Sequence, residues 1–60
     1  MSELLTKRND MGLTQEEIAR RLGVPLRSYI RWEHGESHPS VLARKRIKRI
    51  MGVEVRRNHD

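Results

Sequence analysis

Apolar positions recur at helical spacing through the middle of the chain. They are Ile18, Ala19 and Leu22 before Gly23, then Val24, Tyr29 and Trp32 after it. This spacing puts the apolar side chains on one face of each of two short helices. Gly23 suits a tight turn between them, because glycine adopts a positive φ without steric cost. The pattern therefore predicts two amphipathic helices joined by a tight turn over residues 15–34.

Capping residues predict where the first two helices begin and end. Ser2 suits the N-cap of a first helix that runs to about Met11, and Gly12 ends that helix. Thr14 and Glu17 have the S/T-x-x-E spacing of a capping box, in which side chain and backbone satisfy each other at a helix start. We therefore expect the second helix to start directly after Thr14.

A third helix is expected to begin near Pro25 or Leu26, and Ser40 suits the N-cap of a fourth that runs to about Met51, before Gly52. The predicted buried stripe of the fourth helix is Ala43, Ile47 and Ile50, with help from Val41 and Met51. The domain is thus expected over residues 1–52. Residues 53–60 form a tail, either a short strand that pairs across a dimer or a frayed end.

Length and composition narrow the function classes. Sixty residues make one small domain with little room for an internal ligand cavity. The sequence has no cysteine, no membrane-length apolar run and no signal-peptide pattern, so we expect a cytoplasmic protein. It also lacks paired carboxylates, a nucleophile with a base and a phosphate-binding glycine loop. An enzyme and a bound cofactor are therefore not expected.

The charge balance indicates a polyanionic partner. Thirteen Lys and Arg against eight Asp and Glu give a net charge of +5, which either serves solubility alone or attracts nucleic acid. The excess gathers around residues 26–31 and 44–49, which favours nucleic acid. With Tyr29 and Trp32 as the aromatic residues, both at expected core positions, base stacking is not expected. His34 and His38 lack a third ligand nearby, so no metal site is expected.

The central stretch resembles the helix-turn-helix of the phage repressor/Cro-type (XRE-like) DNA-binding family. The positions that match are Gln15, Ile18, Ala19, Leu22, Gly23, Val24, Tyr29, Trp32, Glu33 and Gly35. The lead-in Arg8-x-x-x-Gly12-Leu13-Thr14-Gln15, and Pro39-Ser40 before an apolar-basic run, extend the match to roughly residues 4–51. The resemblance implies a small all-α, four-helix, lambda-repressor-like fold. It also implies a largely buried ion pair between Arg8 and Glu33; the plain alternative is two solvated charges.

Three positions on the third helix are candidates for base contacts. The resemblance implies that Leu26, Arg27 and Arg31 contact bases. Arg27 and Arg31 are one helical turn apart and so share a face, and a guanidinium can bond bidentately to guanine in the major groove. Leu26 suits a thymine methyl group. The alternative for each arginine is a phosphate contact or a solvated charge.

A second set of positions is expected to contact DNA phosphates. The resemblance implies this role for Gln15 at the start of the second helix, where free backbone N–H groups favour an anion, and for the loop that contains Ser37 and His38. Ser28 suits a phosphate or a base edge. Arg44 belongs to a run of cations without an acidic neighbour, which indicates a phosphate-contacting or dimer-flanking role or a solvated face.

These observations favour a sequence-specific regulator of transcription that binds double-stranded DNA, a repressor on a palindromic operator as a homodimer. One alternative is a protein-interaction module of the same fold, an antitoxin or phage regulator that binds a toxin or antirepressor. Another is a small basic RNA-binding protein, which would prefer structured RNA to duplex DNA.

Overall fold

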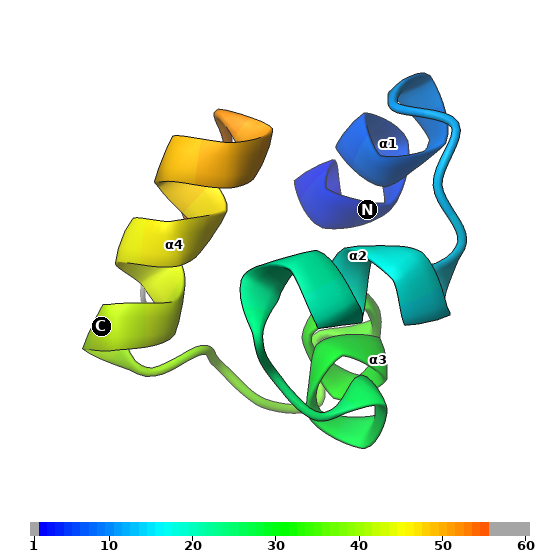
Figure 1. Ribbon diagram of the computed structural model, residues 1–60. Coiled ribbons are helices and arrows are strands. Elements are labelled where there is room, and N and C mark those ends of the chain that lie inside the picture. Colours follow the sequence, from blue (N-terminus) through cyan, green and yellow to red (C-terminus); the bar gives the residue numbers. More distant parts are fainter. Residues whose placement is uncertain (1, 56–60) are drawn as a thin grey trace.

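Four short α-helices account for most of residues 2–55, which are the residues that the computed structural model describes (Figure 1). α1 spans Glu3–Asp10, α2 Gln15–Leu22, α3 Leu26–His34 and α4 Val41–Met51. Within these residues there is no strand. The prediction of an all-α fold with four helices is confirmed. Compared with the predicted bounds, α1 ends one residue earlier, at Asp10, and Met11 is its C-cap.

Local side-chain chemistry sets the helix starts. The hydroxyls of Ser2 and Ser40 each accept a hydrogen bond, at 3.2 Å, from the backbone N–H three residues further on. Thr14 Oγ1 accepts from the Glu17 N–H at 3.1 Å, while Glu17 Oε1 accepts from the Thr14 N–H at 2.8 Å. The predicted capping box is therefore confirmed. Each cap satisfies N–H groups that have no partner inside the helix.

The turn between α2 and α3 depends on Gly23. Its φ of +72° lies in the left-handed region, which other residues enter only with strain. In that conformation the Val24 N–H donates to the Ala19 carbonyl at 3.0 Å, and the Gly23 N–H donates to the Arg20 carbonyl at 3.1 Å. These two bonds close the end of α2 and turn the chain directly into α3.

The helices enclose one core around α2. α2 packs against both α3 and α4, and α1 packs against α3. Figure 1 shows α4 on one side of the α2–α3 pair, with α1 above α2 and α3 below it in this view. The core cluster consists of Leu4, Ile18, Ala19, Leu22, Tyr29, Ile47, Met51 and Val53. Val24, Trp32 and Ile50 are half-buried and pack against this cluster, so the expected apolar faces are the buried ones.

The expectation for Val41 was wrong, because its side chain is 58% exposed. The buried stripe of α4 is Ala43, Ile47 and Met51, and Val41 lies two residues before it, about 200° around the helix. Val41 therefore points to solvent.

The packed part of the molecule continues past Gly52, since Val53 is buried in the core. Residues 53–55 form no strand in the single chain; their pairing across a dimer remains a prediction, and residues 56–60 lie outside the described residues. None of the four helices has the length and apolar character needed to cross a membrane.

Candidate nucleic-acid interface

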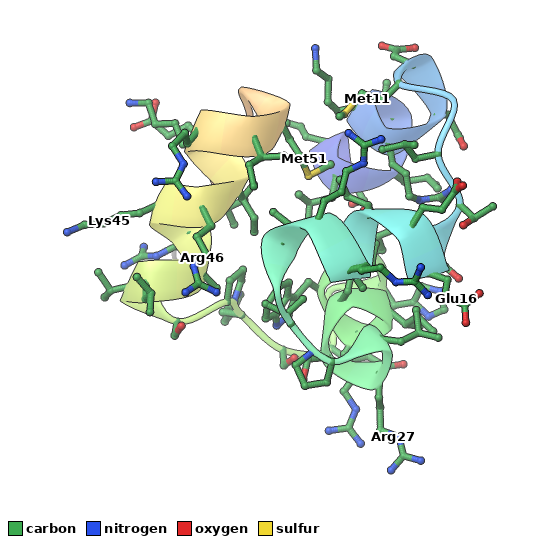
Figure 2. The ribbon with its side chains drawn as sticks, viewed as in Figure 1. Met11, Glu16, Arg27, Lys45, Arg46 and Met51 are labelled. Carbon is green, nitrogen blue, oxygen red and sulfur yellow. The ribbon has the colours of Figure 1, made fainter. Side chains whose placement is uncertain are left out.

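The outer face of α3 presents two arginines to solvent. Arg27 and Arg31 are both exposed, and Figure 2 shows Arg27 pointing away from the body of the protein at the end of the helix pair. Leu26 is 38% exposed beside them. The three candidate base-contacting residues thus come from one helix and reach solvent together. Their contact with bases remains a prediction.

A shallow hollow on the same helix combines apolar and charged side chains. It is lined by Leu26, Arg27, Ile30, Arg31, His34 and Glu36. Among these lining residues Ile30 is half-buried, whereas Arg27 and Arg31 are exposed. Chemically, such a surface offers donors for guanine edges next to an apolar site for a thymine methyl group.

The candidate phosphate contacts lie on other elements. Ser37 is half-buried and His38 exposed in the loop after α3, and Ser28 is half-buried on α3. Arg44 is half-buried and lines a separate hollow beside α4, together with Val41, Lys45, Lys48, Glu54 and Val55. The structure therefore places Arg44 apart from the hollow on α3. Contact of these residues with phosphate remains a prediction.

Beneath the exposed face of α3 lies a polar cluster centred on Glu33. Arg8 Nε donates to Glu33 Oε2 at 2.7 Å, and the side chain of Glu33 is 2% exposed. Tyr29 Oη donates to the same oxygen at 2.5 Å, and Gln15 Nε2 donates to Oε1 at 2.9 Å. One carboxylate thus links α1 and α2 to α3. Removing either member of such a pair leaves an uncompensated buried charge.

Arg8 also fixes the link between α1 and α2. Its Nη1 donates to the Leu13 carbonyl at 2.9 Å. Among the described residues, no buried side-chain nitrogen or oxygen lacks a hydrogen-bond partner. A fully satisfied polar cluster of this kind holds its elements in one arrangement. The cluster therefore holds α3, and with it the exposed Arg27 and Arg31, in a fixed position relative to α1 and α2.

Gln15 is engaged in this cluster, so its side chain braces α3 from the start of α2. The bond to Glu33 uses one N–H of the Gln15 side-chain amide, so a phosphate contact would use the second one. That contact remains a prediction. Sequence reasoning did not assign the Tyr29 hydroxyl to the cluster. The i, i+4 spacing of Tyr29 and Glu33 on one helix was the signal that could have found it.

The surroundings of Glu33 set its ionisation. Burial alone would raise the pKa of the Glu33 carboxyl, but hydrogen bonds from Arg8, Tyr29 and Gln15 outweigh burial and lower that pKa below its ordinary value. Burial, and then the bond to Glu33, raises the pKa of Tyr29. The hydrogen bond to Glu33 raises the pKa of Arg8. At neutral pH the cluster therefore contains an ionised carboxylate, a neutral phenol and a guanidinium ion.

The lowered pKa of Glu33 predicts acid sensitivity. Because the unfolded chain binds the proton first, this contribution to the free energy of unfolding is fully present above about pH 5 and is lost as pH falls through the folded-state pKa. Urea titrations between pH 3 and pH 7 will measure this slope. Glu17 also has a lowered pKa, from its bond to the Thr14 backbone, so the Glu17→Gln variant is the control. We expect Glu17→Gln to keep most of the pH dependence. If the free energy of unfolding of Glu17→Gln no longer varied between pH 3 and pH 7, the slope would come from Glu17 and not from Glu33.

The residues 2–55 do not bring three His, Asp or Glu side chains together in a group that could hold a metal ion. His34 Nδ1 lies 4.0 Å from Glu36 Oε2, and both side chains are more than half exposed. His34 and His38 stand on either side of Gly35, where the chain leaves α3 with a φ of +75°. The structure gives no support for pairing them around an ion.

Comparison with known proteins agrees with this architecture. A family model described as helix-turn-helix matches residues 4–57. The chain therefore belongs to the helix-turn-helix family, and the prediction of family and fold class is confirmed. A curated relative, an uncharacterized HTH-type transcriptional regulator of Methanothermobacter thermautotrophicus, is 45% identical over 47 residues, which cover 78% of this chain and 68% of the relative. No solved structure matches the chain significantly.

Proposed function

We propose that the protein is a transcription regulator that binds double-stranded DNA sequence-specifically, with α3 in the major groove. The observation that carries this proposal is the pair of exposed arginines, Arg27 and Arg31, on a helix whose inner face is fixed by the buried Glu33 cluster. Membership of the helix-turn-helix family supports it, as does the related transcriptional regulator. Bound in this way, α3 selects bases, and polar residues of α2 and of the following loop hold phosphates.

The proposed regulator acts as a repressor on a two-fold symmetric operator. A single helix of nine residues touches few base pairs, so one chain contributes a half-site, and a dimer with half-sites about one helical turn apart gains the affinity that an operator requires. The candidate surfaces for pairing two chains are the end of α4 and Val53–Val55, where Glu54 is exposed and Val55 half-buried, while Val53 is itself buried in the core of one chain.

Selection of bound duplexes from a random library tests this function. We expect the selected sites to share a motif, and two-fold symmetry of the motif would support the dimer. The logarithm of the association constant should fall linearly with the logarithm of salt concentration, with a slope of about −0.9 for each phosphate neutralised. A matched competition with structured RNA serves as the control. Preference for the RNA, or binding that does not vary with salt, would contradict the proposal.

A further inference from the structure

The guanidinium of Arg46 on α4 lies at the turn between α2 and α3. Arg46 Nη1 donates to the Leu22 carbonyl at 3.2 Å, and Arg46 is half-buried. Figure 2 shows Arg46 pointing from α4 toward the α2–α3 pair, whereas Lys45 points outward. Arg46 thus differs in position from its neighbour in the same basic run.

The Leu22 carbonyl belongs to the last turn of α2, whose carbonyls have no partner within the helix. The backbone of the turn satisfies two others, since Gly23 and Val24 donate to Arg20 and Ala19. The Leu22 carbonyl oxygen instead accepts a hydrogen bond from the Arg46 side chain. A cation also suits this place electrostatically, because the C-terminal end of a helix carries partial negative charge.

The fit between Arg46 and the turn is close. A Cβ atom built on Gly23 would lie 3.1 Å from Arg46 Nη1, tighter than ordinary van der Waals contact. Gly23 is favoured by its positive φ, and a larger residue there would also push the Arg46 guanidinium away by a few tenths of an ångström. α3 begins at Leu26, four residues after the carbonyl that Arg46 holds, so any shift of the turn moves the start of α3.

We propose that Arg46 is a positioning residue for DNA recognition, which fixes the α2–α3 turn from α4 and so sets the placement of Leu26 and Arg27. This inference rests on the proposed function. It assigns Arg46 a role different from that of the exposed cations of α4: Arg46 acts through the Leu22 carbonyl, without touching DNA.

The test compares Arg46→Met with Arg49→Met. Both variants remove one positive charge from α4 and keep an unbranched apolar stem, but Arg49 is exposed. Dissociation constants are measured for a duplex selected by the wild-type protein and for a scrambled duplex, over a range of salt and well below the melting temperature of each variant. Specificity is the dissociation constant for the scrambled duplex divided by that for the selected duplex. We expect this ratio to be about tenfold lower for Arg46→Met than for Arg49→Met, the size expected for the loss of one charge-assisted hydrogen bond. The salt slopes of the two variants should be equal.

Two results would overturn the assignment. Equal weakening on both duplexes with a shallower salt slope than that of Arg49→Met would make Arg46 a phosphate contact. A lower melting temperature with an unchanged ratio of constants would make the hydrogen bond merely structural. Amide hydrogen exchange at Gly23 and Val24 gives a readout without DNA, and we expect it to accelerate in Arg46→Met alone. If the wild-type protein selects no duplex, the proposed function fails, whereas the exchange result still tests the hold on the turn.

Discussion

Replacement of Glu33 by glutamine is expected to cost about 3–5 kcal/mol of the free energy of unfolding, the cost of stranding one member of a buried ion pair. The partners of Glu33 are all donors: Arg8, Gln15 and Tyr29. A glutamine at this position places an amide nitrogen, itself a donor, against them, and leaves the Arg8 charge unbalanced. A chain of this length has roughly 3–9 kcal/mol in total, so the loss removes about a third of that stability at the least, and Glu33→Gln should unfold at a markedly lower denaturant concentration than wild type.

Chemical denaturation followed by circular dichroism measures this loss. Glu36→Gln is the matched control, because it makes the same chemical change at a carboxylate that is 63% exposed; its stability should stay within about 0.5 kcal/mol of wild type. A second pair of variants isolates the stranded charge. Arg8→Met combined with Glu33→Leu should be more stable than Glu33→Leu alone. Equal stability of Glu33→Gln and Glu36→Gln would show that the cluster contributes nothing.

The helix positions could be predicted from the sequence because their determinants are local. Ser2, Ser40 and the Thr14–Glu17 box act on N–H groups three residues away, and Gly23 ends a helix by its own backbone freedom. The spacing of apolar residues then gave the core-facing sides. Val41 shows the limit of the pattern: apolar character alone predicts burial near the start of α4, but the angular position of Val41 relative to Ala43 places it on the outer side.

The links between elements could not be predicted from the residues alone. The resemblance pointed to Arg8 and Glu33 as partners, but no local pattern indicates that Gln15, 18 positions before Glu33, donates to the same carboxylate. Arg46 is one of five cations on α4, a helix without an acidic residue. What separates it from the others is a backbone carbonyl 24 positions earlier, and a carbonyl leaves no mark in the sequence. Such contacts depend on how the helices pack.

Replacement of Arg27 or Arg31 by alanine is expected to cost about 1–3 kcal/mol of binding free energy on the selected duplex and to relax the preference at one base pair. Both side chains are exposed on the outer face of α3, so their removal should leave the free energy of unfolding unchanged. Selection experiments repeated with each variant measure the preference position by position. Arg20→Ala removes the same charge from α2 and should weaken binding, if at all, equally on every sequence.

The spacing of the two arginines sharpens this prediction. Four residues correspond to about 6 Å along the helix axis, and successive phosphates of one strand are about 3.4 Å apart along the duplex. If both arginines contact bases, the two relaxed positions should therefore lie no more than about two base pairs apart within one half-site. Relaxed positions further apart than this would require a different placement of α3 on the duplex. Uniform weakening by both variants would make the arginines phosphate contacts and leave the choice of bases to other side chains of the same surface, Leu26 and Ile30.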